Sequence, residues 1–244
     1  MAVLWQQQIS GVNYEIRSAG KTRRLYTDGV FHSQYNPNHA LAGGVWDALF
    51  IPAFFVEPGT IQRVLVLGVG GGAVIHLLHR YLQPDSITGI ELNPVHIRLA
   101  KKYFAIKPTV AMLHQADAIK WLQDYKGPGF DLIIEDLFAE QEGEPVRAVN
   151  ANRNWLQTLS DNLSDNGILV MNFTAASDLK NSAAITCKKI AHQFQDRFRF
   201  SLPQYDNVIA AFLKKSSSVK ICRENFHRVT GMKHMPELSI RRIS

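Results

Sequence analysis

The sequence predicts an α/β protein of the Rossmann-like type, with a mainly parallel sheet that ends in an antiparallel hairpin. From residue 61 onward, short apolar runs alternate with helical patterns, as in a parallel sheet covered by helices on both faces. A glycine-rich loop, residues 68–72, separates the first of these runs from the first helix. The last two runs are joined by residues 203–206 alone, which is too short for a crossover helix and predicts the hairpin.

Residues 1–60 are predicted to form a small β-rich region with a connecting helix. Two strand-like runs flank Asp28 and Gly29, a pair typical of a tight hairpin because both turn positions favour positive φ. The pattern over residues 38–55 is helical and breaks near Pro52.

Residues 61–213 are predicted to form the Rossmann-like domain, built from alternating strands and helices. The expected strands are 64–67, 87–91, 109–114, 131–135, 167–172, 198–202 and 207–213. The expected helices are 73–81, 94–104, 118–125, 154–163 and 182–194.

The composition of the 244-residue chain is ordinary for a globular protein, with 46% hydrophobic and 20% charged residues. No apolar run approaches the ~18 residues needed to cross a bilayer, and no basic segment precedes the short apolar patch at the N-terminus. Cys187 and Cys222 have neither a metal-binding spacing nor the pattern of a disulfide framework. We therefore expect a cytoplasmic protein that binds no metal and no membrane.

The net charge of +6 lies entirely in a basic C-terminal tail, residues 214–244. This segment holds eight Lys and Arg against two acids, and residues 1–213 are neutral. Such a segment is either solvated or binds an anionic partner such as RNA; the tail has no nucleic-acid motif, so RNA is not favoured. Phe226, Met232, Met235 and Leu238 instead indicate a segment that packs back onto the body.

The glycine loop predicts a nucleotide or nucleoside ligand. Gly68, Gly70 and Gly72 form G-x-G-x-G directly between a predicted strand and a predicted helix. Glycine lets the backbone turn sharply, and the amide groups at a helix start favour an anion or a polar ribose edge. Glu91 ends the next strand, where a carboxylate accepts hydrogen bonds from ribose hydroxyls.

Further acids favour a site of the S-adenosylmethionine type over a dinucleotide site. Asp117 and Ala118 follow the third strand, where Asp117 can hold an adenine amino group. Asp136 stands at the carboxyl end of the fourth strand, facing the crevice in which such sheets bind ligands. We expect Asp136 to orient a nucleophile or accept its proton. Strand alternation turns Glu135 away from Asp136.

These segments together resemble the spermidine synthase family, an aminopropyltransferase branch of the class I methyltransferase fold. The segments similar to the family's motifs, in chain order, are "YTDGVFHS", "VWDALFIPAFF", "VLVLGVGGGAVIHLL", "GIELN", "ADAIKWL" and "FDLIIEDLF". The resemblance covers about residues 25–170. It implies a donor such as S-adenosylmethionine or its decarboxylated form, a small-molecule acceptor and a homodimer. It also makes His32, at the position of a family glutamine, a second catalytic candidate.

Several acids of that family are replaced here. The loop acid that holds the donor's amino group is Gly71, the glutamate of the helix motif is Ala48, and the second acid after the fourth strand is Ala139. Burying ammonium groups without carboxylate partners is costly. Gly71 also removes a repulsion against a methionine carboxylate. The sequence therefore favours S-adenosylmethionine itself and methyl transfer, with aminopropyl transfer from the decarboxylated donor and a non-catalytic nucleoside-binding role as alternatives.

Overall fold

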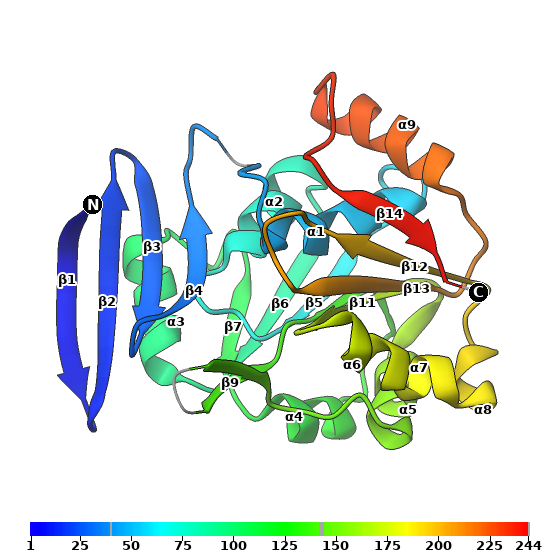
Figure 1. The fold of residues 1–244 in the computed structure, drawn as a ribbon, viewed down its shortest axis with the longest axis horizontal. Helices are drawn as coiled ribbons and strands as arrows, with labels where there is room; N and C mark the ends of the chain where they lie inside the picture. Colours follow the sequence, from blue (N-terminus) through cyan, green and yellow to red (C-terminus); the bar gives the residue numbers. More distant parts are fainter. Residues whose placement is uncertain (40, 142–143, 244) are drawn as a thin grey trace.

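The computed structural model describes residues 1–39, 41–141 and 144–243 (Figure 1). Its N-terminal part is a four-stranded antiparallel sheet of β1 (Ala2–Ile9), β2 (Val12–Ala19), β3 (Thr22–Thr27) and β4 (Val30–Tyr35). Asp28 and Gly29 connect β3 to β4 with φ of 46° and 83°, so the tight hairpin predicted at this pair is confirmed. The long β1–β2 hairpin was not singled out from the sequence.

The central sheet has eight strands. Their spatial order is β14 (Ser239–Arg242), β12 (Asp196–Ser201), β13 (Val208–Leu213), β11 (Leu163–Phe173), β8 (Phe130–Glu135), β5 (Arg63–Leu67), β6 (Ser86–Glu91) and β7 (Met112–Gln115). The strands from β11 to β7 pair in parallel, whereas β13, β12 and β14 pair antiparallel. This arrangement confirms the Rossmann-like fold with its C-terminal antiparallel hairpin.

Helices cover both faces of the central sheet. They are α1 (Val45–Phe50), the 3₁₀ helix η1 (Ile51–Phe55), α2 (Ala73–Tyr81), α3 (Pro94–Tyr103), α4 (Ala118–Asp124), α5 (Arg153–Asp161), α6 (Ala176–Asn181), α7 (Ala183–Thr186), α8 (Lys188–Ala191) and α9 (Val219–Thr230). Alternate side chains of β5 enter two different cores: Val64 and Val66 face the core with α2 and α3, and Leu65 and Leu67 face the core with α4 and α5. The single helix predicted over 182–194 is two short helices, because Cys187 between them is extended.

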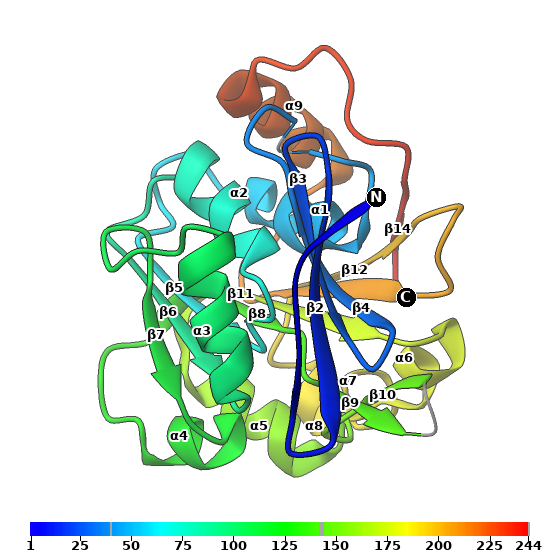
Figure 2. The same ribbon diagram turned by 90° about the vertical axis from the view of Figure 1, so that its left-hand side faces the viewer.

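The N-terminal sheet stands in front of the central sheet when viewed from its own side (Figure 2). Its strand β4 lies against the start of α2, where the Ser33 hydroxyl accepts a hydrogen bond of 3.3 Å from the amide of Ala73. The sheet therefore contacts the glycine loop directly. A short hairpin, β9 (Phe138–Gln141) and β10 (Glu144–Arg147), follows β8 in the chain.

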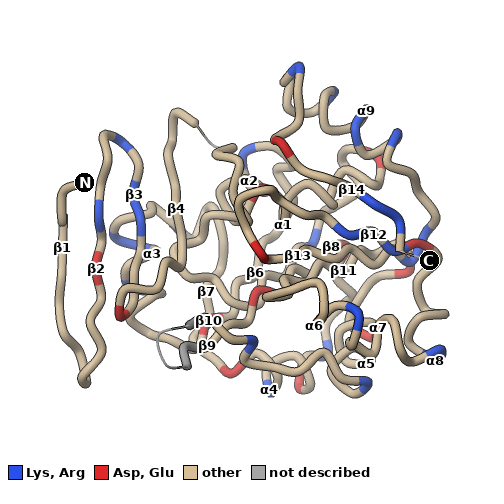
Figure 3. The backbone as a smooth tube through the Cα atoms, in the orientation of Figure 1, with Lys and Arg blue, Asp and Glu red and all other residues tan. Residues whose placement is uncertain are grey.

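The C-terminal segment packs onto the body, as its apolar residues predict. Phe226 of α9 is fully buried, with its ring 5.3 Å from that of Phe54 in η1, and β14 adds a strand to the edge of the central sheet. Lys and Arg gather on β12, β14 and α9 (Figure 3). Removal of the segment after Lys215 would therefore expose this core. No helix among the described residues is long and apolar enough to span a membrane.

Candidate functional site

A cavity of about 790 Å³ opens at the carboxyl ends of β5, β6 and β8, beneath the β3–β4 hairpin. Its volume is in the range of small-molecule sites. Most of the residues predicted from the sequence line it: His32, Gly68, Gly70, Glu91, Asp117, Ala118 and Asp136. We call the part around Glu91 and Asp117 the nucleoside side, and the part around Trp46, Asp136, Ala139 and Tyr205 the acceptor side. Gly72 lies behind the wall, at the start of α2, where an added Cβ would meet Ile106 at 2.8 Å.

The glycines of the loop are required by packing against neighbouring strands. Gly68 has φ of +85°, and a Cβ there would lie 2.1 Å from the backbone oxygen of Asp136. Gly70 has φ of +52°, and a Cβ there would lie 3.0 Å from the backbone oxygen of His32. Close approach at Gly68 brings the end of β8, and with it Asp136, against the nucleoside loop.

Gly71 has a structural reason that the sequence did not reveal. A Cβ at this position would lie 2.8 Å from the Cβ of Ser33 and 3.0 Å from the ring of Phe104. The space that an acidic side chain would need is therefore filled from β4 and from the end of α3. This packing explains the glycine. Gly71 is therefore not evidence that the donor carries a carboxylate.

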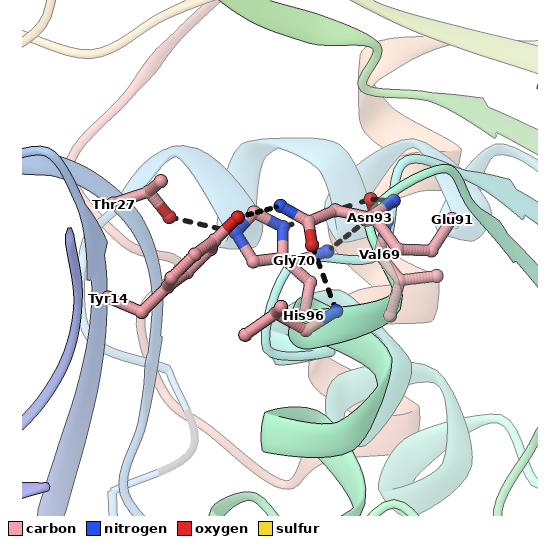
Figure 4. A network of polar contacts seen from close by, with 8 residues as sticks. Tyr14, Thr27, Val69, Gly70, Glu91, Asn93 and His96 are labelled. Atoms are coloured by element: carbon pink, nitrogen blue, oxygen red, sulfur yellow. Dashed lines mark hydrogen bonds and ion pairs between the residues drawn. The ribbon is translucent and has the colours of Figure 1, made fainter. Parts of the chain in front are cut away.

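Glu91, at the end of β6, is held by main-chain amides (Figure 4). Its Oε2 accepts hydrogen bonds of 2.9 Å from the amides of Val69 and Gly70, and its Oε1 accepts one of 2.9 Å from Asn93. Burial alone would raise the pKa of this carboxyl, but the nearby His96 and the amide donors lower it below its ordinary value. Glu91 is thus held as a carboxylate, the form that accepts hydrogen bonds from hydroxyl groups.

His96 of α3 joins this acid to the N-terminal sheet. Its Nε2 lies 2.8 Å from the hydroxyl of Thr27, and its Nδ1 lies 3.8 Å from Oε1 of Glu91. Next to it, the Nδ2 group of Asn93 donates a hydrogen bond of 3.0 Å to the hydroxyl of Tyr14 (Figure 4). The nucleoside side is therefore built partly by β2 and β3, which sequence motifs did not indicate.

Asp117 is the N-cap of α4. Its Oδ1 accepts hydrogen bonds of 2.9 and 3.0 Å from the amides of Ile119 and Lys120. Both cap bonds use the same oxygen, and Asp117 and Ala118 both line the cavity. The residue thus combines a structural role with a position suited to an adenine amino group.

Asp136 lies on the acceptor side, where the end of β8 meets the glycine loop. Its Oδ1 accepts a hydrogen bond of 2.8 Å from the Nδ2 group of Asn172, and Asn172 in turn accepts one of 3.0 Å from Asn207. Burial raises the pKa of Asp136 to about 6, against the opposing effects of Asn172 and Arg147. The preceding Glu135 is fully buried and bonded to Arg147, as the predicted alternation requires.

His32 reaches the cavity from β4. Its ring centre is 5.0 Å from that of His96, and its buried Nε2 has no hydrogen-bond partner among the residues that the structure describes. Burial, with a further effect of His96, lowers the pKa of His32 to about 4, so its ring is neutral near pH 7. A neutral imidazole with an unpaired buried nitrogen is suited to contact a ligand.

Several lining residues had no place in the sequence-based site, among them the polar residues His96, Asn172, Tyr205 and Asn207. Asn172 carried a signal, because it is a polar residue within the apolar run of β11. Trp46 stands on the cavity wall against Phe31, with ring centres 5.2 Å apart. Across the described part of the chain, no cluster of three or more His, Cys, Asp or Glu could hold a metal ion.

A glycine loop, an acid ending the second strand of the domain and an acid capping α4 define a class I S-adenosylmethionine-dependent transferase fold. Within this class, the chain belongs to the spermine/spermidine synthase domain family, whose model matches residues 51–225. The structure is similar to that of a probable spermidine synthase from Corynebacterium glutamicum, with a TM-score of 0.76 and 17% sequence identity. The match covers 99% of this chain and 91% of that one.

Two curated relatives carry a more specific name. Polyamine aminopropyltransferase of Vibrio vulnificus is 28% identical over 146 residues, which are 59% of this chain and 47% of that protein. Polyamine aminopropyltransferase 2 of Caldanaerobacter subterraneus is 25% identical over 200 residues, 80% of this chain and 63% of that protein. The chain thus spans about half to two thirds of the length of the curated relatives it matches.

These relatives contradict the sequence-based preference for methyl transfer. They are named for aminopropyl transfer, the alternative reading, and that reading now has the better support. The preference for methyl transfer rested on the replaced acids. Gly71 contributed because the missing acid was taken to favour a donor that carries a methionine carboxylate. The packing of Ser33 and Phe104 against Gly71 removes that argument.

Proposed function

We propose that this protein transfers the aminopropyl group of decarboxylated S-adenosylmethionine to a small-molecule amine. The observation that carries the proposal is the position of Asp136, a buried carboxylate in the same cavity as Glu91 and Asp117. Glu91 holds the ribose hydroxyls and Asp117 the adenine amino group of the donor. The amine acceptor lies beside Asp136.

In the reaction, the acceptor nitrogen attacks the carbon of the aminopropyl arm that is bonded to the sulfonium sulfur. The carbon–sulfur bond breaks, its electron pair stays on sulfur, and methylthioadenosine leaves as a neutral thioether. The new secondary amine releases one proton, which the Asp136 carboxylate accepts. With a pKa of about 6, Asp136 is ionised near neutral pH and is still basic enough to take part.

The chain contributes mainly by placing the two reactants. The contact of Gly68 with the end of β8 holds Asp136 next to the nucleoside loop, so donor and acceptor are held at a fixed separation. Trp46, Phe31 and Tyr205 give the acceptor side an aromatic wall. His32, the second catalytic candidate, offers its unpaired Nε2 to an ammonium hydrogen of a substrate.

The test is a donor and acceptor assay with product identification. The protein is incubated with decarboxylated S-adenosylmethionine and each of a panel of amines, including putrescine, and methylthioadenosine and the aminopropylated amine are measured by mass spectrometry. Stoichiometric formation of both products is expected. A protein that binds methylthioadenosine but forms neither product with any amine would contradict the proposal.

Other expectations stay predictions. They are a homodimer, a cytoplasmic location, and the absence of RNA binding through residues 214–244. Sedimentation with and without methylthioadenosine addresses the first, and a salt-dependent RNA-binding assay addresses the last.

A further inference from the structure

Asn172 is a polar residue in the apolar, buried C-terminal part of β11, residues 168–173. Its neighbours in β11 from Ile168 to Met171 are at most 1% exposed, Phe173 is 0% exposed, and Asn172 itself is only 4% exposed. Burying an amide side chain without hydrogen bonds is unfavourable, because the amide loses its hydrogen bonds to water. An apolar residue would therefore suit the strand better, unless the amide has a task at the carboxyl end of the sheet.

The contacts of Asn172 form a directed chain. Its Nδ2 group donates to Oδ1 of Asp136 at 2.8 Å, and its Oδ1 accepts from the Nδ2 group of Asn207 at 3.0 Å. An ionised carboxylate only accepts hydrogen bonds, so it requires the NH₂ end of Asn172. The oxygen of Asn172 must then face Asn207, which must present its own NH₂ end. The orientation of both amides thus follows from a charged Asp136.

The backbone of Asn172 is anchored as well. Its carbonyl oxygen accepts a hydrogen bond from the guanidinium of Arg147, which also binds both oxygens of Glu135 at 2.8 and 2.9 Å. Parallel pairing of β11 with β8 places Met171 opposite Glu135, and hence Asn172 level with Asp136. Asn172, which donates the hydrogen bond to Asp136, is therefore held through both its side chain and its main chain.

The charged groups that act on Asp136 come from three elements. Arg147 on β10 favours its charged form, and Glu91 on β6 opposes it. Glu135, the neighbour on β8, is paired with Arg147 on the opposite face. Burial disfavours the charged form of Asp136. The side-chain amide of Asn172 offsets this effect by donating a hydrogen bond directly to the carboxylate.

We propose that Asn172, oriented by Asn207, is a positioning residue that keeps the Asp136 carboxylate ionised and aimed into the cavity. The inference rests on the proposed function for its effect on turnover. Its effect on the ionisation of Asp136 is independent of which reaction the protein catalyses.

The decisive variant is Asn172→Asp, which keeps the shape of the side chain and replaces the donor by a second carboxylate. Two carboxylates in contact share a proton, so their first ionisation is easy and their second is difficult. We expect the pKa at which the pair becomes fully ionised to rise by at least about one unit above that of Asp136 in the unmodified protein. The acid limb of the pH profile of kcat/KM should move to higher pH by the same amount.

The measurement is a carbon-13 NMR titration of the side-chain carboxyl groups in protein labelled at aspartate. The Asp136 signal is identified by its loss in Asp136→Asn. Asn207→Ala should move the same pKa upward by a smaller amount, because it frees Asn172 to turn. Asn225→Asp is the matched control: Asn225 is equally buried at 3% exposure, but it donates to Phe54 and Val56 far from the cavity.

An unchanged Asp136 titration in both Asn172→Asp and Asn207→Ala would overturn the proposal, as would an equal shift in Asn225→Asp. Because the titration needs no turnover, it decides the point even if no amine is aminopropylated. In that case the proposed function alone would fail. Binding of methylthioadenosine, measured by calorimetry, shows that each variant is folded.

Discussion

The two sides of the cavity hold their carboxylates in different ways. On the nucleoside side, Glu91 and Asp117 accept hydrogen bonds from main-chain amides within three residues of each acid or in the glycine loop. On the acceptor side, Asp136 accepts its hydrogen bond from the side chain of Asn172, 36 positions away. The pKa of Glu91 is lowered, whereas burial raises the pKa of Asp136 to about 6.

This difference separates a binding function from a chemical one. A carboxylate with a low pKa and several amide donors stays charged and is a poor proton acceptor, which suits a group that only grips ribose. A carboxylate with a raised pKa exchanges protons near neutral pH. Under the proposed function, the nucleoside side serves affinity and the acceptor side serves the reaction, and substitutions on the two sides should have separate effects.

The largest effect is expected from Asp136→Asn. Loss of a proton acceptor typically lowers kcat by about 10²–10⁴-fold, while the affinity for methylthioadenosine should be unchanged. Steady-state kinetics and calorimetry measure the two quantities. Asp131→Asn is the control, because Asp131 lies on the same strand but accepts from Gln62, Arg63 and Ser164 at its other end. If Asp136→Asn and Asp131→Asn lost turnover equally, Asp136 would have no specific role in the reaction, and the proposed difference between the two sides of the cavity would be wrong.

A stability effect outside both sides is expected from Phe226→Ala. This ring is fully buried between α9 and η1, and truncation of a buried phenylalanine lowers the free energy of unfolding by about 3–5 kcal/mol. Ile221→Ala, on the same helix but 38% exposed, should lower it by less than about 1 kcal/mol. Urea denaturation measures both. A stable Phe226→Ala protein would mean that the C-terminal segment is separable from the fold.

Glu91, Asp117 and the glycine loop could be predicted from sequence because each belongs to a recognisable motif, whereas the contribution of β2 and β3 to the nucleoside side could not. Glu91 and Asp117 each end a recognisable strand or begin a helix, and the loop glycines mark the turn between them. The support of Asp136 could not be predicted, since it depends on the sheet order, which places β11 beside β8 and β13 beside β11. The reason for Gly71 was equally hidden, because Ser33 lies 38 positions earlier and meets the loop only in the folded chain.

A binding effect of intermediate size is expected from Glu91→Gln. Removing the charge from a hydrogen-bonding group weakens binding by about 1.5–3 kcal/mol, or roughly 10- to 150-fold in Kd. The value of kcat at saturating donor should change much less than the KM for donor. Glu15→Gln, a buried acid of the N-terminal sheet, is the control for a general effect of removing a buried charge. A fall in kcat with an unchanged Kd would show that Glu91 takes part in the reaction rather than in donor binding.

The smallest effect is expected from Asp117→Asn, and it separates two roles of one residue. Asparagine caps helices about as well as aspartate, so the bonds to Ile119 and Lys120 should survive. The charged acceptor for the adenine amino group is lost, and we expect a weaker affinity by about 0.5–1.5 kcal/mol, or roughly 2- to 13-fold. Asp117→Ala should lose this contact and the cap together, lowering both affinity and the free energy of unfolding.

Calorimetry with methylthioadenosine and with its inosine analogue, in which the amino group is replaced by oxygen, provides the measurement. If Asp117 contacts the amino group, the unmodified protein should prefer the adenine form, and Asp117→Asn should reduce that preference. An Asp117→Asn protein that binds both ligands as the unmodified protein does would show that Asp117 is only a helix cap. Recognition of the base on the nucleoside side would then rest on groups other than this carboxylate.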